Sequence, residues 1–300
     1  MVRKHKVVIA TSTKCFHRCC YCTAHYLQQV KGKIMPLDKF DRLVRILKRE
    51  GYGTIIPYHI GELILHPQYE EILCCVAGHQ MPCSIHSRLG IKMGKDKWER
   101  IFNAFGEAKK SLSIEVTIDG LPGDVETTAV NLDYSVQWKN IEMIASVING
   151  MNKRFGKMIL TTLVTSLNEY RLDLIEDRAK GLGVIWRARP FGRINQYEKP
   201  EHLEMINKLA PKGAKWRKLL KVDKDGNVRN RSVPCRDAGV IAVIGLEGEV
   251  LICCMDSLHE TGCGNVFEED SVDKVIESDQ YKENLRKAHK KLFNCCHNKC

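Results

Sequence analysis

Hydrophobic positions along the first 195 residues follow two alternating patterns. Short apolar runs, several with period two, predict strands over 6–12, 53–62, 83–87, 111–119, 157–165 and 184–189. Apolar residues at helical spacing predict helices over 37–47, 68–76, 97–105, 140–149 and 172–182. Repeated strand–helix units form a parallel sheet with right-handed crossovers. We therefore expect an α/β fold whose residues 1–195 make a partial (β/α)6 TIM-like barrel.

Two of these strands carry polar side chains at alternate positions. Glu115, Thr117 and Asp119 share one face of the strand over 111–119, opposite a fully apolar face. Because the outer face of a barrel strand packs on helices, we expect the three polar residues to point into the barrel. Arg187 and Arg189 likewise share a face of the last strand. They either hold a carboxylate or phosphate inside the barrel or lie in solvent at the strand end.

The pattern changes beyond residue 195. Residues 196–232 are charged, carry two prolines and predict a basic linker with one or two short helices. Residues 233–300 predict a small cysteine-rich domain with a hairpin over 241–252 that turns at Glu247 and Gly248. Half of the 14 cysteines of the chain fall in this last region: Cys235, Cys253, Cys254, Cys263, Cys295, Cys296 and Cys300.

Composition narrows the class of protein. No apolar run approaches the roughly 20 residues that span a bilayer, and no secretory signal is visible, so we expect a cytoplasmic protein without a membrane partner. In a reducing compartment 14 cysteines indicate metal ligands, catalytic thiols or buried small residues rather than disulfides. Cys74, Cys75 and Cys83 lie at apolar positions and are expected to be buried. The formal charge of +11 favours an anionic partner: nucleic acid, a phosphorylated metabolite or an acidic peptide.

A CxxxCxxC array follows the first strand, in the sequence CFHRCCYC. Cys15, Cys19 and Cys22 would then lie at the carboxyl-terminal mouth of the barrel, where such barrels keep their active sites. Three thiolates hold three irons of a 4Fe-4S cube and leave the fourth iron open for a ligand. The alternative is a zinc site that uses Cys19 and Cys22 with two cysteines from elsewhere and leaves Cys15 idle.

This array, with Tyr21 before its last cysteine, resembles the hallmark of the radical S-adenosylmethionine (SAM) superfamily, and the resemblance extends over about 190 residues as a six-unit partial barrel. The resemblance implies that SAM chelates the open iron and is cleaved by one electron to a 5′-deoxyadenosyl radical, which abstracts hydrogen from a substrate. The electron would come from a donor such as flavodoxin or ferredoxin. No catalytic side chain is assigned.

Further positions match the same family. Gly61 and Glu62, in HIGELILHP, resemble its GGEP element, whose backbone and acid meet the SAM amino group, although Ile60 and Leu63 depart from it. Thr117, in VTIDG, stands where relatives often place a serine that contacts the SAM carboxylate. Some relatives also place an arginine after this DG, and here Lys139 is the nearest substitute. The remaining cofactor-binding candidates follow: Asn168 in TSLNEY, which is otherwise a helix N-cap, Arg187 and Arg189.

The C-terminal region resembles the SPASM auxiliary-cluster extension or its shorter form, the twitch domain. Cys235, twelve residues, Gly248, four residues and Cys253 match its opening pattern, whereas Cys296 and Cys300 at the end are one residue further apart than in the twitch form. The resemblance implies one auxiliary 4Fe-4S cluster on these four cysteines, and the alternative is a zinc knuckle. The substitute ligands are Cys254, Cys263 and Cys295.

The sequence therefore indicates a radical SAM enzyme, an oxidoreductase or isomerase, that modifies an anionic, nucleotide-linked or nucleic-acid-linked substrate. A peptide maturase and a small-polyol dehydrogenase with the same chemistry are the enzymatic alternatives. Because the chain begins directly at its first strand, we expect no leader-binding domain, which weighs against the maturase. A non-enzymatic zinc protein that binds nucleic acid is the alternative from another class.

Overall fold

The computed structural model describes residues 4–19, 22, 32–59, 61–124, 128–151, 155–190, 204, 207–218, 239–254, 256 and 259–290. In this part of the chain a nine-stranded sheet runs in the order β11-β10-β9-β1-β3-β4-β5-β7-β8. Six of its strands are mutually parallel neighbours and make the predicted partial barrel. They are β1 (Lys6–Ile9), β3 (Thr54–Ile56), β4 (Cys83–Ser87), β5 (Leu112–Thr117), β7 (Gly156–Val164) and β8 (Ile185–Pro190).

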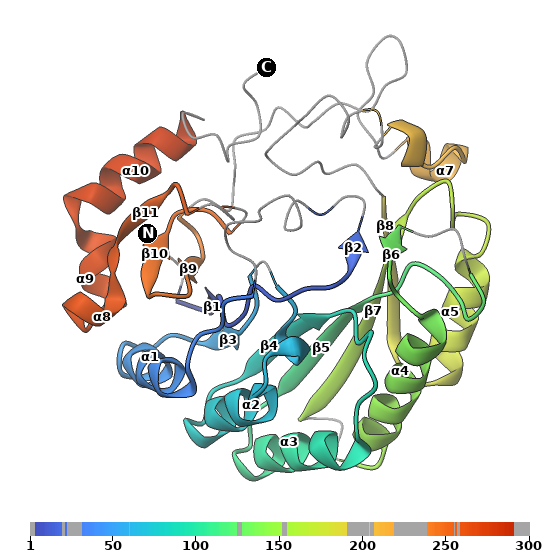
Figure 1. Cartoon of the computed structure of the whole chain (residues 1–300), viewed down its shortest axis with the longest axis horizontal. Coiled ribbons are helices and arrows are strands. Elements are labelled where there is room, and N and C mark those ends of the chain that lie inside the picture. The colour runs from blue at the N-terminus through green and yellow to red at the C-terminus, as the bar shows by residue number, and fades with distance from the viewer. Residues whose placement is uncertain are drawn as a thin grey trace.

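Five helices cover the convex outer face of this curved sheet (Figure 1). They follow the predicted order, while several expected bounds of helices and strands need correction, among them the end of the first strand at Ile9 rather than residue 12. The fourth helix begins at Tyr134 rather than near residue 140, because the Asp133 carboxylate caps it by accepting from the backbone of Ser135 at 2.8 Å. The second strand ends at Ile56, since Pro57 has no N–H to donate to a ladder. The helices are α1 (Leu37–Arg49), α2 (Tyr69–Gly78), α3 (Lys95–Glu107), α4 (Tyr134–Asn149) and α5 (Leu172–Gly181).

The C-terminal elements continue the barrel sheet (Figure 1). The predicted hairpin is present as β9 (Ala242–Ile244) and β10 (Glu249–Leu251), and β9 pairs in parallel with β1. Its turn uses Gly248 at φ 94°, a conformation that glycine adopts without strain. The other elements of this region are β11 (Gly262–Asn265), α8 (Val266–Glu269), α9 (Val272–Glu277) and α10 (Asp279–His289).

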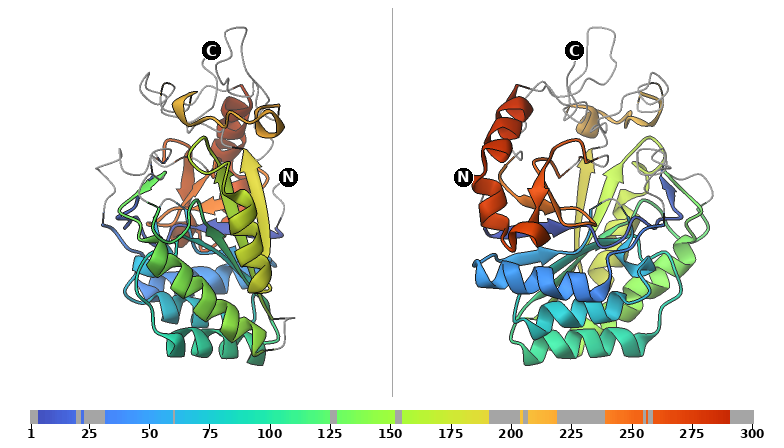
Figure 2. Two further views of the ribbon diagram at one scale, coloured as in Figure 1. Left: turned by 90° about the vertical axis from the view of Figure 1, so that its right-hand side faces the viewer. Right: turned by 60° about the vertical axis from the view of Figure 1, so that its left-hand side comes forward.

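Three smaller elements lie around the mouth of the barrel (Figure 2). The strands β2 (Arg18–Cys19) and β6 (Ala129–Val130) form a separate antiparallel pair, and a 3-10 helix, η3 (Leu63–Leu65), follows β3. The short helix α7 (Ala214–Arg217) falls within the predicted linker. Among the described residues no helix has both the length and the apolar character needed to cross a membrane.

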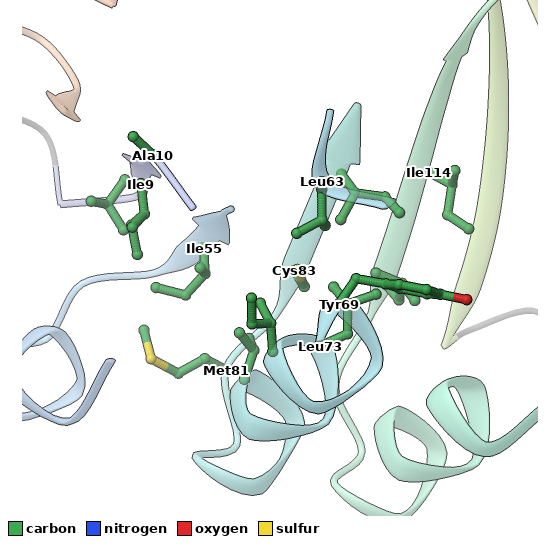
Figure 3. Close-up of a cluster of buried hydrophobic side chains, with 14 of the residues drawn as sticks. Ile9, Ala10, Ile55, Leu63, Tyr69, Leu73, Met81, Cys83 and Ile114 are labelled. Atoms are coloured by element: carbon green, nitrogen blue, oxygen red, sulfur yellow. The ribbon is translucent and has the colours of Figure 1, made fainter. Parts of the chain in front are cut away.

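The main core lies between the sheet and the outer helices. Figure 3 shows Ile9, Ile55, Cys83 and Ile114, which come from four neighbouring strands, facing Leu73 and other side chains of the α2 layer. Each of these side chains is at most 1% exposed, so Cys83 is buried as expected. The same continuous cluster includes apolar residues of the C-terminal strands and helices. The barrel and the described C-terminal elements therefore share one hydrophobic core.

We predict that Ile114→Ala lowers the free energy of unfolding by about 3 kcal/mol, because it removes a fully buried side chain and leaves a cavity. Ile185→Ala is the matched control, since that isoleucine also lies in a barrel strand but is 56% exposed. Anaerobic denaturant unfolding measures both variants. Equal losses of stability would mean that the helix-facing side of β5 is not the core.

Candidate functional site

Three cysteines of one loop gather at the mouth of the barrel. Cys15, Cys19 and Cys22 follow β1, and the pairing of Cys19 with Ala129 anchors the loop to β6. The backbone N–H of Cys22 donates to the carbonyl of Cys19 at 2.9 Å, which folds the second half of the motif into a turn. Cys19 is buried, Cys22 is half-buried and Cys15 is exposed. Tyr21 lies outside the described residues.

The spacing of these thiols bears on which metal centre they fit. Within the described part of the chain, Cys15, Cys19 and Cys22 do not form a group whose sulfur atoms all lie within 4.8 Å of one another. A tetrahedral zinc ion, with Zn–S bonds of about 2.3 Å, would hold thiolates about 3.8 Å apart. Binding a single zinc ion would therefore require these side chains to move closer together, whereas a 4Fe-4S centre takes one iron per thiolate.

A buried ion pair lies beside Cys19. Arg88 follows β4 and Asp119 follows β5, and the guanidinium Nη1 lies 2.9 Å from the Asp119 Oδ2. The two side chains are 9% and 1% exposed. Asp119 also accepts from Thr128 Oγ1 at 2.7 Å and from the backbone N–H of Leu163 at 3.2 Å. A buried charge pair is tolerated when such additional hydrogen bonds satisfy it. Through these contacts the pair connects the ends of β4, β5 and β7.

The same arginine reaches the three-cysteine loop. Its Nη2 lies 3.5 Å from Cys19 Sγ. Burial raises the pKa of the Cys19 thiol, and the Arg88 guanidinium opposes that rise by favouring the thiolate, which is the form that binds metals. The sequence analysis assigned no role to Arg88. Its position directly after a barrel strand, at the carboxyl-terminal end, is the signal that could have identified it.

The loop after β3 packs directly on the cysteine loop. A Cβ added to Gly61 would lie 2.1 Å from the carbonyl oxygen of Ser12, so only glycine fits there. The next residue, Glu62, donates its backbone N–H to the carbonyl of Lys14 at 2.8 Å. These contacts bring the predicted Gly61–Glu62 element against the backbone that leads into the three-cysteine motif.

The Glu62 carboxylate is buried and only partly satisfied. Its Oε2 accepts from the backbone N–H of Arg88 at 2.9 Å, and Ser87 and Ile64 also favour the carboxylate, whereas its Oε1 has no hydrogen bond of ordinary geometry among the described residues. Burial raises the pKa of Glu62, whose side chain lies close enough to Cys15 and Cys19 to shift their pKa values upward as well. Because a buried unpaired oxygen is costly, it marks a place for a ligand that donates hydrogen bonds. An ammonium group fits that place, close to Cys15 and Cys19.

Thr117 and Asn168 lie on either side of Asp119. Thr117 ends β5 on the inner face, and its backbone carbonyl accepts from Gln137 Nε2 at 2.9 Å. The Asn168 Nδ2 donates to the carbonyls of Asp119 at 3.1 Å and Leu163 at 3.0 Å. Helix α5 begins at Leu172 with Arg171 as its N-cap, so Asn168 is not a helix cap. Its amide instead ties the loop after β7 to the end of β5.

The polar faces of β5 and β8 meet inside the barrel, as the alternation predicts. Glu115 Oε1 accepts from Thr161 Oγ1 at 2.9 Å and pairs with Arg187 Nη2, while Arg189 Nη2 lies 3.7 Å away. His86 Nε2 lies 3.9 Å from the other carboxylate oxygen. Although burial acts to raise it, the pKa of Glu115 lies below its ordinary value because Arg187, His86 and Thr161 favour the carboxylate.

Two arginines therefore face one carboxylate, which leaves this inner wall positive. The Arg187 side chain is 37% exposed and that of Arg189 is 54% exposed, so both retain hydrogen-bonding capacity toward the cavity. The alternative of fully solvated arginines at a strand end fits Arg189 better than Arg187.

A contact between distant segments links Cys254 to the loop after β3. His59, two residues before Gly61, places its Nε2 3.1 Å from the carbonyl oxygen of Cys254. Cys253 is buried at 9% exposure in the loop after β10. Three of the four predicted cluster ligands, Cys235, Cys296 and Cys300, lie outside the described residues, as does the substitute Cys295.

The two substitute ligands that the structure describes, Cys254 and Cys263, make other contacts. Cys254 packs against the small apolar cluster of Val8, Val243 and Leu251. Cys263 is buried in β11, where its thiol donates to the carbonyl of Thr261 at 3.1 Å and accepts from Asn284 Nδ2 at 3.4 Å. Cys263 therefore has a structural role in the C-terminal core.

Residues 235–300 match the SPASM family, which is described as an iron-sulfur cluster-binding domain. No curated protein matches the sequence of this chain.

The fold is similar to that of three solved proteins at low sequence identity. BtrN, in complex with AdoMet and 2-DOIA, matches with a TM-score of 0.58 and 12% identity over 99% of this chain and 94% of BtrN. SuiB from Streptococcus suis, bound to S-adenosylmethionine, matches with a TM-score of 0.61 and 14% identity over 93% of this chain and 67% of SuiB. The protein anSMEcpe, with bound AdoMet and a Kp18Cys peptide, matches with a TM-score of 0.58 and 15% identity over 97% of this chain and 87% of anSMEcpe. The chain therefore has the fold of the radical SAM enzymes and carries, over residues 235–300, an iron-sulfur cluster-binding domain of the SPASM family.

Proposed function

We propose that this chain is a radical SAM enzyme that holds a 4Fe-4S cluster on Cys15, Cys19 and Cys22 and binds SAM at the remaining iron. The observation that carries the proposal is the buried Glu62 Oε1, without a hydrogen-bond partner among the described residues, near the thiols of Cys15 and Cys19 at the barrel mouth. When bound and reduced, the cluster and SAM supply a 5′-deoxyadenosyl radical that abstracts hydrogen from the substrate. AdoMet in the structures of BtrN, SuiB and anSMEcpe supports this choice of cofactor.

Different residues around the three-cysteine loop would contact different parts of SAM and of the cluster. Glu62 would accept hydrogen bonds from the SAM amino group, and the close packing of Gly61 on Ser12 would keep this carboxylate against the cluster. Thr117 would lie on the opposite side, at the end of β5, toward the SAM carboxylate. Arg88 would act as a positioning residue that favours the thiolate of Cys19 against the effect of burial and holds Asp119 in place.

The C-terminal domain would hold one auxiliary 4Fe-4S cluster. We assign its ligands to Cys235, Cys253, Cys296 and Cys300, in keeping with the iron-sulfur description of the matching family. The occupied thiol of Cys263 and the packing of Cys254 make these two residues poor substitutes. The contact of His59 with Cys254 would keep the auxiliary site close to the mouth, where it could relay an electron or contact substrate.

For the substrate we propose an anionic molecule that enters the barrel toward Arg187 and Arg189. Guanidinium groups recognise carboxylate and phosphate equally well through paired hydrogen bonds, so nucleotide-linked, nucleic-acid and acidic peptide substrates share this chemistry. A peptide is the second candidate, because SuiB has been solved with the precursor peptide SuiA and anSMEcpe with a peptide. A small molecule is the third candidate, because BtrN has been solved in complex with 2-DOIA.

We predict that Cys19→Ala abolishes reductive cleavage of SAM, since only two thiolates would remain to hold the cluster. Cys235→Ala should leave some cleavage that is uncoupled from substrate. The assay is 5′-deoxyadenosine release after anaerobic reconstitution and reduction with dithionite, with iron, sulfide and zinc counted in the same samples. Cys74→Ser, a half-buried helix cysteine, is the control that should retain full cleavage.

Two outcomes would contradict the assignment. Complete and equal loss in the Cys19 and Cys235 variants would mean that the two cysteine sites are not separable. Colourless protein with stoichiometric zinc and no deoxyadenosine would support the non-enzymatic zinc alternative.

Arg88→Gln should lower the free energy of unfolding by about 3 kcal/mol, because it leaves Asp119 buried without its cation. The double variant Arg88→Gln with Asp119→Asn should regain part of that stability, since no uncompensated charge remains. Arg189→Gln, a half-exposed arginine in the same barrel, serves as the control and should unfold like the unmodified chain. Denaturant unfolding under anaerobic conditions measures all four proteins, and an undiminished stability of Arg88→Gln would contradict a structural role for the pair.

The substrate class can be tested through hydrogen abstraction. Deuterated pools of RNA, DNA, nucleotides and acidic peptides are incubated with the reconstituted enzyme, and deuterium in 5′-deoxyadenosine identifies the pool. For the active pool, Arg187→Gln with Arg189→Gln should raise KM about tenfold or more, since two charge-assisted hydrogen bonds are lost. Uncoupled SAM cleavage should persist in this variant. An unchanged KM would place substrate binding elsewhere.

A further inference from the structure

Three potential metal ligands meet between α1 and α2, which Figure 1 shows as neighbouring helices of the outer layer. Asp41 comes from α1, Cys75 from the last turn of α2, and His79 is the C-cap residue of α2. Their ligand atoms all lie within 4.8 Å of one another, and this is the only such group of three His, Cys, Asp or Glu residues in the described part of the chain. None of them belongs to the cysteine motifs considered above.

The backbone presents these groups on facing surfaces. Cys75 and His79 are four residues apart, and the His79 N–H donates to the Cys75 carbonyl at 3.0 Å, so the helical path continues between them. Residues at this spacing lie on one face of a helix. That face turns toward α1, where Asp41 lies. The arrangement joins two ligands from one helix with a third from its neighbour.

The distances are close to those of a tetrahedral zinc site. Cys75 Sγ lies 3.5 Å from Asp41 Oδ1, and His79 Nε2 lies 2.7 Å from the same oxygen. With ordinary zinc bonds to sulfur, nitrogen and oxygen, the sulfur–oxygen and nitrogen–oxygen edges are about 3.6 Å and about 3.4 Å. The sulfur–oxygen distance therefore already suits a zinc ion. The nitrogen–oxygen distance must increase by about 0.7 Å, and the imidazole then exchanges its hydrogen bond to Asp41 for a bond to the metal.

The chemistry of the three ligands favours zinc over magnesium and calcium. Thiolate and imidazole disfavour magnesium and calcium, whereas zinc accepts sulfur, nitrogen and carboxylate oxygen in one shell. Thiolate and carboxylate together carry two negative charges. Arg45 pairs with the other oxygen of Asp41, which leaves Oδ1 directed at Cys75 and His79.

The site is also accessible. The His79 and Asp41 side chains are 25% and 34% exposed, and Cys75 is half-buried, which departs from the full burial expected of it from the sequence. An ion can therefore enter from solvent, and water can take the fourth position. Cys74, the adjacent half-buried cysteine, is not part of the group.

We propose that Asp41, Cys75 and His79 bind a zinc ion that clamps α1 to α2, separately from the iron-sulfur sites. A ligand that binds the folded chain and not the unfolded one stabilises it by mass action. Zinc at this site should therefore raise the melting temperature. Because the ligands lie on the outer helical layer, SAM cleavage should not depend on it.

The test uses the full chain with its iron-sulfur clusters reconstituted, so that the cluster cysteines are already occupied. Zinc chloride is titrated in competition with a chromophoric chelator, and bound zinc is counted by elemental analysis after desalting. The unmodified chain and Cys74→Ser should bind one zinc ion and melt at a higher temperature with it. Cys75→Ser and His79→Gln should lose at least about tenfold in affinity, since even the partners of zinc ligands contribute that much.

X-ray absorption at the zinc edge gives an independent readout. The proposal requires one sulfur and three lighter ligands around the bound zinc. Three or four sulfurs would place the ion at the cysteine motifs instead and overturn the assignment. Equal zinc affinity in Cys75→Ser and Cys74→Ser would also overturn it, as would the absence of tight zinc in the unmodified chain.

Discussion

The buried pair of Arg88 and Asp119 organises the mouth of this barrel. Its two members follow adjacent strands, and Asp119 also binds the backbone of β7 through Leu163. The backbone of Arg88 supports Glu62, and its guanidinium reaches Cys19. One ion pair thereby joins the strand ends, the acid proposed to meet SAM and the loop proposed to hold the cluster. Because both charges are withdrawn from water, neither can change without disturbing the other.

The inner face of the barrel sheet is polar, whereas its outer face, which packs on the helices, is apolar. The alternation of β5 places Ile114 in the helix-facing core and Glu115 on the cavity wall. A filled barrel would bury apolar side chains on both faces. Here the inner wall instead presents arginines that outnumber the acid they contact. Such a surface suits an anionic substrate and agrees with the positive charge of the whole chain.

The C-terminal region is built onto the barrel through backbone pairing. The strand β9 lies parallel to β1, which is the strand that leads into the three-cysteine loop. His59 adds a second link by binding the carbonyl of Cys254. These contacts connect the two cysteine-rich regions through short, rigid segments. A shared hydrophobic core makes relative movement of the described parts costly, because separation would expose apolar surface.

Much of the fold could be predicted from the sequence, since its signals are local. Strand and helix periods are set by residues within one turn or a few positions of one another, and CxxxCxxC is a spacing within eight residues. The same reasoning placed Glu115 on an inward face and left Arg187 either inside the barrel or in solvent. It could not place Arg88 beside Asp119 and Cys19, which lie 31 and 69 positions away along the chain.

The amino-acid order by itself determined the alternating α/β layout, the inward polar face and the candidate cluster ligands. Tertiary structure alone decided which arginine neutralises Asp119, that β9 extends the sheet at β1, and that Asp41 meets Cys75 and His79. The physical reason is that periodicity and motif spacing are properties of neighbouring residues. Contacts between distant segments form only when the chain closes and excludes water from its core.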